Sequence, residues 1–235
     1  MKWAEMHCHT VYSISKAGFG RDSLVAVPDL LKRAKEVGLS AIAITDHDCM
    51  NGYEEAIKIS EKYGITIIPA EEFETDKMGQ MLGYGITKGI VSKRPVGEIV
   101  KDIQKSGGLA VIPHPYDAMR KMEEPEMVSK IVDGVEVFNI GSFGNDRAKK
   151  LAMEAGVKIM TGGSDAHGLA LVGAVRMGFP DWCKKPDDYI SCMKAGKTVI
   201  KQFMGQRRAL LLALGCLVET KIEGILHRKR YLSYE

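Results

Sequence analysis

The chain has 235 residues, 45% of them hydrophobic and 27% charged, which is enough to bury the core of one large domain or two small ones. Its net charge of +3 is spread over scattered basic residues, so charge alone gives no argument for nucleic-acid binding. The five cysteines form no C-x-x-C pair, a pattern typical of reduced thiols. With no signal peptide and no apolar run of membrane-spanning length, we expect a soluble, cytoplasmic protein without membrane contacts.

Short apolar runs alternate with amphipathic helical patterns along the chain. Several runs are apolar on both faces, as expected for parallel strands covered by helices. Strands are predicted at residues 3–9, 40–45, 65–69, 81–84, 109–112, 135–138 and 157–161. Helices are predicted at residues 28–37, 52–63, 95–105, 124–131 and 146–155, most of them ending at a glycine.

This alternation predicts a β/α architecture, either an open doubly wound sheet or a closed barrel. The first strand is not followed by G-x-G-x-x-G, so the dinucleotide-binding form of the open sheet lacks support. After about residue 200 the pattern changes, and residues 206–227 are typical of one long helix or two short ones. We therefore divide the chain into a β/α domain at 1–203 and a helical extension at 204–235, packed on that domain.

Five of the six histidines occupy one kind of position, the end of a predicted strand. His7 and His9 end the first strand, His47 follows the second, and His114 and His167 follow two later ones. Because the carboxyl ends of parallel strands meet at one surface, these imidazoles are expected to converge. Glutamates 71 and 72 follow the strand at 65–69 in the same way.

The spacing of these residues favours a metal site. His7 and His9 are two apart on a strand, so both rings face one side and Cys8 the other. Asp165 and His167 repeat that spacing. Imidazole and carboxylate without thiolate favour zinc, manganese or iron over a cysteine-rich structural zinc site. A shared carboxylate among several imidazoles indicates more than one ion.

At these residues the sequence resembles the PHP (polymerase and histidinol phosphatase) family. The resemblance covers roughly residues 3–201 and rests on a set of short motifs that appear in family order. They are His7-Cys8-His9-Thr10, Thr45-Asp46-His47-Asp48, Pro69-Ala70-Glu71-Glu72, Leu82-Gly83-Tyr84, Pro113-His114-Pro115, Gly134-Val135-Glu136-Val137-Phe138-Asn139 and Ser164-Asp165-Ala166-His167. The resemblance implies a distorted seven-stranded, TIM-like β/α barrel, two to three divalent metal ions and phosphoesterase activity.

The resemblance also implies a set of metal ligands in three groups. They are His7, His9, Glu72 and Asp165 for the first ion, Glu72 as a bridge with His114 for the second, and His47 with His167 for the third. Glu72 is preferred to Glu71 because the family pattern places the ligand three residues after Pro69. Neighbouring strand residues point to opposite faces, so only one of the two glutamates should face the ions.

Two positions depart from the family pattern. The family often has an aspartate a few residues after H-x-H, where this chain has Ser13-Ile14-Ser15-Lys16. It also often has a histidine before Leu-Gly-Tyr, where this chain has Gln80. We therefore expect the third ion to lose an anionic ligand and the second an imidazole, so that the ions bind more weakly or fewer bind.

The leading functional hypothesis is hydrolysis of a small phosphorylated substrate. A water bridging two ions, zinc in preference to manganese or iron, is deprotonated and attacks phosphorus. Asp165 and His167 are the candidates for proton transfer to the leaving group, although a metal-bound imidazole cannot perform it. Four loop cations are candidates for contacting phosphate at the border of the site: Lys16, Arg21, Lys77 and Arg120.

Two alternatives stay open at the level of sequence. The first is a nuclease or exonuclease acting on nucleic-acid phosphodiesters, which the polymerase-associated family members suggest but the low net charge does not favour. The second is a degenerate, non-catalytic metal-binding or interaction module, motivated by Ile14 and Ser15, by Gln80 and by the basic tail at 228–230. The substrate, the oligomeric state and the role of the C-terminal extension are not predicted.

Overall fold

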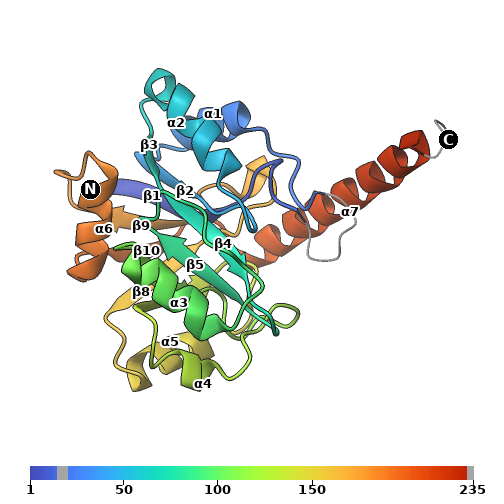
Figure 1. Ribbon diagram of the computed structural model, residues 1–235. Helices are drawn as coiled ribbons and strands as arrows, with labels where there is room; N and C mark the ends of the chain where they lie inside the picture. The colour runs from blue at the N-terminus through green and yellow to red at the C-terminus, as the bar shows by residue number, and fades with distance from the viewer. Residues whose placement is uncertain (15–20, 232–235) are drawn as a thin grey trace.

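The computed structural model describes residues 1–14 and 21–231, with side chains as far as Glu223. These residues form an α/β fold of ten strands, seven α-helices and one 3-10 helix (Figure 1). The strands are β1 (Lys2–Cys8), β2 (Ala41–Ile44), β3 (Thr66–Ile68), β4 (Ala70–Glu74), β5 (Gln80–Tyr84), β6 (Leu109–Ile112), β7 (Gly134–Asn139), β8 (Ile159–Gly163), β9 (Val175–Phe179) and β10 (Val199–Gln202). The helices are α1 (Val27–Glu36), α2 (Asn51–Tyr63), α3 (Val96–Lys105), α4 (Pro125–Val128), α5 (Asn145–Glu154), η1 (Leu169–Leu171), α6 (Pro186–Lys194) and α7 (Gln206–Tyr231).

The strands pair as two mixed five-stranded sheets, β10-β9-β1-β2-β3 and β4-β5-β6-β7-β8. Two isolated parallel bridges lie between them, one from Cys8 to Ala166 and one from His47 to Glu72. No continuous ladder joins the sheets among the described residues, so the closed seven-stranded barrel is not confirmed. Both bridges lie where predicted ligands are found, at the ends of β1 and β2.

All seven predicted strands are present, but the two sheets are mixed, whereas the two-sided apolar runs favour parallel strands. Strand β5 runs antiparallel to β4 and β6, and β9 runs antiparallel to β1 and β10. The segment 75–79 between β4 and β5 is too short for the crossover that a parallel pair needs, so the two strands form a hairpin. Strands β4, β9 and β10 were not among the predicted strands.

The predicted helices are confirmed, with shifts of one or two residues at most ends. Helix α4 is shorter than expected, and α6 was not predicted. Helix α2 ends where a glycine was expected to stop it: Gly64 has φ of +68°, the left-handed conformation that glycine adopts without a Cβ clash. Similar glycine stops follow α1, α3 and α5.

The C-terminal segment forms one helix, α7, which extends away from the rest of the molecule (Figure 1). Its first turns pack on the body: Ala209 is buried, and a Cβ at Gly168 would lie 2.2 Å from Cys216 Sγ. On the outer side Leu211, Leu214 and other apolar residues are exposed. The domain boundary at 203/204 stays a prediction. None of the described helices combines the length and apolarity that a bilayer crossing requires.

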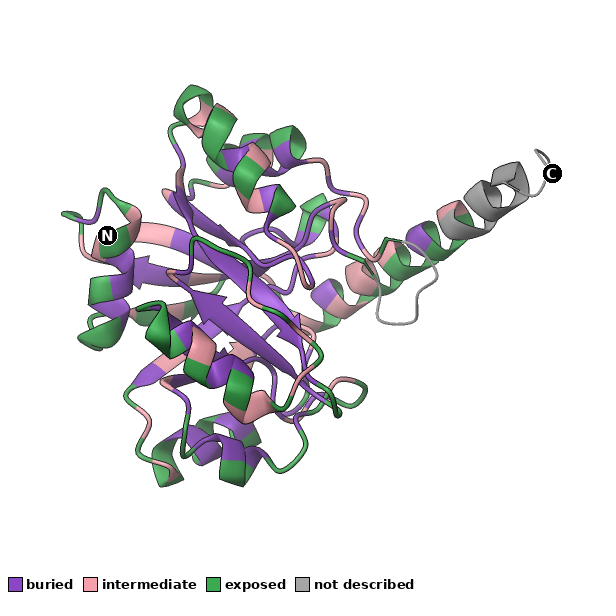
Figure 2. Cartoon of the chain, in the orientation of Figure 1, coloured by how far each residue is buried: buried purple, intermediate pink, exposed green. Residues whose placement is uncertain are grey.

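The strands form the buried centre of the molecule, and the exposed residues lie mainly on the helices and loops around it (Figure 2). The apolar side chains of β2 and β6 are fully or nearly fully buried, as their two-sided apolar pattern predicts, and those of β1 and β7 are buried except for the partly buried Trp3 and Phe138. A large share of the buried residues is nevertheless polar, and most of these lie at the carboxyl ends of the strands. Buried polar groups at one end of the strands locate the candidate site.

Candidate metal centre

Strand β1 delivers two imidazoles to one side, as its spacing predicts. His7 and His9 are both fully buried, and their ring centroids are 5.3 Å apart. Cys8 points the other way, into the apolar core, where its Sγ donates to the carbonyl of Ala43 at 3.3 Å. The alternation of the strand therefore separates the polar site from the core within three residues.

Glu72 occupies the middle of the site. Its Oε2 lies 3.3 Å from His7 Nε2, from His9 Nε2 and from His47 Nδ1. Its Oε1 lies 3.4 Å from His114 Nε2. One fully buried carboxylate thus faces four imidazoles from three separate stretches of chain, the arrangement expected of a group that bridges cations.

Asp165 closes the same cluster from the end of β8. Its Oδ1 lies 3.2 Å from His9 Nε2 and 3.5 Å from His7 Nε2. The ring of His167 stacks on that of His9 with centroids 4.2 Å apart, and His167 Nδ1 contacts the backbone carbonyl of Asp165 at 3.0 Å. All predicted site residues therefore come together: His7, His9, His47, Glu72, His114, Asp165 and His167.

Three sets of ligand atoms lie close enough to share an ion. Within each set the atoms are no more than 4.8 Å apart; the sets are His7-His9-Asp165, His7-Glu72-His114 and His9-His47-His167. The first two resemble the groups expected for the first and second ions. The third adds His9 to the expected pair of His47 and His167.

Sequence reasoning missed Asp22, which lies at this third set. Its Oδ2 is 3.1 Å from His47 Nε2 and 3.7 Å from His167 Nε2. An antiparallel bridge between Ile14 and Arg21 brings Asp22 back beside Ser13. The expected loss of an anionic group is therefore wrong, because the carboxylate comes from farther along the chain. A search of the whole segment before α1 for an acidic residue would have found it.

Gln80 occupies the position where the family often has a histidine. It lies in a different part of the cluster from the second metal site, where we expected it. Its Nε2 donates to Glu74 Oε1 at 2.8 Å and lies 3.4 Å from His47 Nδ1. Gln80 therefore lies beside His47 rather than beside His114. Both Gln80 and Glu74 are buried, on the paired strands β5 and β4.

A second layer of polar groups orients the imidazoles. Glu136 Oε1 lies 3.1 Å from His7 Nδ1, and its Oε2 accepts the backbone N–H of His114 at 3.0 Å. Ser13 Oγ lies 3.1 Å from His9 Nδ1 and accepts the backbone N–H of His47. Such partners fix the ring orientation and tautomer of metal-binding histidines. Glu136 belongs to the family-like motif at residues 134–139, but the sequence alone assigned it no role.

Two other carboxylates of the motifs accept hydrogen bonds from backbone N–H groups outside the cluster. Asp46 accepts hydrogen bonds from the backbone N–H and the hydroxyl of Thr10, at 2.6 and 2.7 Å. Asp48 accepts the backbone N–H of Glu74 at 2.9 Å. Glu71 is buried away from the cluster, and burial raises its pKa to about 8. The preference for Glu72 over Glu71 agrees with this placement.

Only one of the four loop cations is seen to reach the cluster. Arg120 Nη1 lies 2.7 Å from Asp165 Oδ2, while its Nη2 lies 3.5 Å from Asp117 Oδ2. Lys77 forms an exposed pair with Glu123, and Arg21 is exposed. Lys16 lies outside the described residues, as do the side chains of the basic tail at 228–230.

The backbone is strained at two of the clustered residues. His114 has φ of +27° and Asp165 has φ of +48°, in the left-handed region that residues with a Cβ rarely adopt. Such conformations cost about 1–3 kcal/mol each and persist where the surrounding structure imposes them. Here the strain aims an imidazole and a carboxylate at the same centre.

The electrostatics of the cluster favour bound positive charge. Burial opposes protonation of His47, but Glu72 and Asp22 outweigh it and raise its pKa to about 9. His9, buried among His167 and His47, has its pKa lowered to about 3. Burial opposes ionisation of Glu72, yet the adjacent imidazoles hold its pKa well below its usual value. The carboxylates stay charged and draw cations toward them.

The site fits divalent metal ions on its own geometry. Several converging atoms accept or donate no hydrogen bond within the described part of the chain: His9 Nε2, Glu72 Oε1, His114 Nε2 and Asp165 Oδ1. Buried polar atoms are normally satisfied, so atoms left without partners and aimed at one another call for a ligand between them. Nitrogen and oxygen donors in this mixture suit zinc, manganese or iron.

A scan against protein families agrees with the geometry. The PHP domain model matches residues 5–162, more than half of the chain, and the PHP-associated model matches residues 143–198. The chain belongs to the PHP domain family. The family assignment made from the motifs is thereby confirmed.

Among curated PHP relatives, an uncharacterized protein of Methanocaldococcus jannaschii is 33% identical over 58% of this chain and 81% of its own length. The 5'-3' exoribonuclease of Haemophilus influenzae is 26% identical over 60% of this chain, but over only 53% of its own length. The DNA polymerase III PolC-type of Caldanaerobacter subterraneus is 33% identical over 45% of this chain, which is 7% of that protein.

Solved structures share the fold at low identity. A two-domain protein of Bacteroides vulgatus, titled as containing a predicted PHP-like metal-dependent phosphoesterase, aligns with a TM-score of 0.72 at 17% identity, over 93% of this chain and 69% of that one. PsfC of Pseudomonas syringae aligns with a TM-score of 0.70 at 18% identity, over 93% and 98% of the two chains.

Proposed function

We propose that this PHP domain hydrolyses phosphate esters at two to three divalent metal ions held by the cluster. The observation that carries the proposal is the single Glu72 carboxylate facing four imidazoles, with nitrogen and oxygen atoms left without hydrogen-bond partners around it. The proposed ligands are His7, His9, His47, Glu72, His114, Asp165 and His167, with Asp22 added. Zinc is the preferred ion, with manganese or iron as alternatives.

Metal ions at this site would activate a water for attack on phosphorus and neutralise charge on the phosphoryl oxygens. The protein's part is to hold the ligands rigidly, because a preorganised site costs no rearrangement during reaction. Glu136 and Ser13 fix the rings of His7 and His9 from behind. The fold packs these groups in the buried interior, where electrostatic interactions are stronger than in water.

Two residues at the edge of the cluster are proposed to act on the substrate. The side chain of His167 is 17% exposed, which leaves it accessible from outside. Together with Asp165 it remains the candidate for moving a proton to the leaving group. Arg120, 32% exposed, contacts Asp165 with one nitrogen and carries further donors suited to phosphate oxygens.

The structure weakens one argument for the alternative of a non-catalytic metal-binding module. It depended partly on a missing carboxylate after H-x-H, and Asp22 supplies that group to His47 and His167. Gln80 remains a departure, but it lies at the side of the cluster and within hydrogen-bond distance of Glu74. Metal-dependent hydrolysis is therefore the function that the geometry supports best.

The proposal is tested by turnover of p-nitrophenyl phosphate by the metal-loaded protein. We expect turnover that disappears with a chelator and with His7→Ala, which removes a ring from two of the three ligand sets. Lys194→Ala is the control, because Lys194 lies at the opposite ends of the strands, where its Nζ donates to the carbonyl of Gly107. Turnover that persists in His7→Ala would contradict the proposal.

A further inference from the structure

Strand β1 is irregular just where it delivers its imidazoles. Its parallel register with β2 shifts between Glu5 and Cys8. Met6 and His7 therefore lie opposite a single residue of β2, Ala43. Such a β-bulge changes the direction of side chains and leaves backbone groups without partners in the ladder. The backbone that leads into His7 therefore needs hydrogen-bond partners from elsewhere in the molecule.

The carboxylate of Glu5 supplies those partners. Its Oε1 accepts the backbone N–H of Met6 at 3.0 Å and that of His7 at 3.1 Å. The hydroxyl of Tyr84, on β5, donates to the carbonyl of Met6 at 2.9 Å. Buried backbone groups are nearly always satisfied, and at this bulge side chains satisfy them in place of a neighbouring strand. Glu5 thereby holds the backbone N–H of a proposed metal ligand.

The same carboxylate reaches the segment that carries Asp165. Glu5 Oε1 also accepts the backbone N–H of Ser164 at 3.0 Å, and Oε2 accepts that of Gly173 at 2.9 Å. The hydroxyl of Ser164 in turn accepts the N–H of Val175, on β9, at 2.9 Å. Asp165 follows directly, with its left-handed φ of +48°. The residue before this strained ligand is therefore held by Glu5 through its backbone and by β9 through its side chain.

Glu5 acts where the two sheets lack a continuous ladder. Strands β1 and β8 belong to different sheets, and an isolated bridge between Cys8 and Ala166 pairs the segments at their ends. Glu5 is fully buried, and its oxygens lie outside the three sets of candidate ligand atoms. Burial of a carboxylate is costly unless hydrogen bonds compensate it, and an apolar side chain would fill the same space without that cost. The carboxylate is therefore explained by the N–H groups that it gathers.

We propose that Glu5 is a positioning residue of the metal centre. Its carboxylate fixes the bulge of β1 against the end of β8, and so aligns His7 and His9 with Asp165. These three residues form one of the sets of converging ligand atoms. The inference rests on the proposed metal-dependent function and adds to it a residue that acts through the backbone of the ligands.

The test compares variants that keep or remove the acceptor oxygens of Glu5. Glu5→Gln keeps the shape and one oxygen, whereas Glu5→Met keeps a similar volume without an acceptor. In a titration with zinc we expect Glu5→Met to weaken one ion by about 10- to 100-fold, the usual effect of losing a group that orients metal ligands. Glu5→Gln should lose only about 5-fold, since the hydrogen bond to Gly173 is the one that its amide group cannot accept.

A matched control separates positioning from stability. Ile190→Ala removes a buried side chain of α6 from the apolar core and should lower stability to chemical denaturation without changing zinc binding. The absorption spectrum of the cobalt-loaded protein reports the arrangement of the ligands. We expect that spectrum to change in Glu5→Met, to be largely restored in Glu5→Gln and to match the wild type in Ile190→Ala.

Two results would overturn the role of Glu5. One is a Glu5→Met protein with wild-type zinc affinity and cobalt spectrum, and the other is equal impairment of Glu5→Met and Glu5→Gln. If Glu5→Met does not fold, Glu5→Asp takes its place, because its carboxylate is one methylene too short to reach all four N–H groups; unchanged metal binding in that variant would likewise refute the proposal. A wild-type protein that binds neither zinc nor cobalt would refute the metal centre itself, and the role of Glu5 with it.

Discussion

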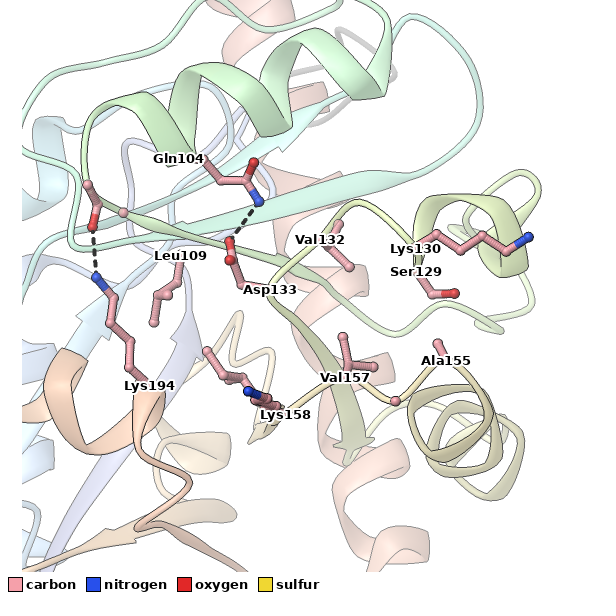
Figure 3. Close-up of a pocket in the computed structure, with 14 residues that line it drawn as sticks. Gln104, Leu109, Ser129, Lys130, Val132, Asp133, Ala155, Val157, Lys158 and Lys194 are labelled. Carbon is pink, nitrogen blue, oxygen red and sulfur yellow. Dashed lines mark hydrogen bonds between the residues drawn. The ribbon is translucent and has the colours of Figure 1, made fainter.

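The two ends of strands β6, β7 and β8 differ: an open pocket lies at the amino ends, and the cluster of ionisable side chains lies at the carboxyl ends. At their amino ends lies an open pocket of about 620 Å³, lined by residues just before or at the start of the strands and by Lys194 of α6 (Figure 3). Its polar groups satisfy one another: Gln104 donates to Asp133 at 3.2 Å, and Lys194 donates to the carbonyl of Gly107 at 3.2 Å. At the carboxyl ends the space is filled, and buried imidazoles and carboxylates crowd together.

Buried polar atoms without hydrogen-bond partners, rather than empty volume, mark the end of the strands that carries the cluster. The amino-end pocket has no buried group of the described residues aimed into it without a partner. The carboxyl-end cluster has several such atoms, strained backbone at His114 and Asp165, and pKa values displaced in both directions. Perturbed titration and strain gather at functional sites because structure has to impose them.

The largest effect should come from exchanging one of two adjacent glutamates. Glu72→Gln removes the charge that faces four imidazoles, and we expect phosphoesterase activity to fall by roughly 1000-fold or more, the scale of losing a preorganised charge stabiliser. Glu71→Gln changes an equally buried neighbour outside the cluster and should keep both metal and activity. Metal content by mass spectrometry and initial rates check both variants. Equal losses of metal and activity in Glu72→Gln and Glu71→Gln would contradict the placement of Glu72 alone in the cluster.

A smaller effect is expected at Asp22. Asp22→Asn removes the anionic partner of His47 and His167, and groups that support metal ligands typically contribute 10- to 100-fold, so we expect a loss of about that size. Asp29→Asn, an exposed carboxylate of α1, is the control. Titration with zinc should show weakened binding of one ion in Asp22→Asn alone. Zinc binding and hydrolysis rates in Asp22→Asn equal to those of the wild-type protein would show that Asp22 is not part of the site.

Close packing at the reactive end predicts an effect on stability. A Cβ at Gly163 would lie 2.4 Å from His7 Cβ and 2.9 Å from Glu136 Oε1, so Gly163→Ala should cost about 1–3 kcal/mol and displace His7. Gly205→Ala meets open space and should be tolerated. Chemical denaturation of the metal-free proteins measures both. A Gly163→Ala protein as stable as wild type would show that the cluster is less tightly packed than described.

The smallest effect belongs to the pocket at the amino ends. Gln104→Ala removes exposed hydrogen bonds to Asp133 and to the carbonyl of Ile131, worth no more than about 1 kcal/mol together in this setting. Activity and metal content should match the wild-type protein. A large loss of activity would mean that the two ends are coupled.

The site could be located from the sequence because the carboxyl ends of strands in β/α folds lie at one surface. His7 lies at the end of a strand that is recognisable from its sequence, and His114 and Asp165 follow two others, so their convergence could be predicted. Strand β4 could not, since Glu71 and Glu72 interrupt the apolar pattern that identifies buried strands. Its polar residues belong to the site and the loops rather than to the core.

Asp22 escaped prediction because the spacing of the motifs does not reveal its position. The antiparallel bridge between Ile14 and Arg21 places Asp22 beside Ser13, and so beside His47 and His167.

The most direct test of the central claim is the metal content of the purified protein, measured together with that of Glu72→Gln. The arrangement around Glu72 predicts two to three divalent ions per chain in the wild-type protein and a clear loss of ions in Glu72→Gln, with Glu71→Gln unaffected. A wild-type protein that binds no divalent ion when zinc, manganese and iron are each supplied would contradict the account.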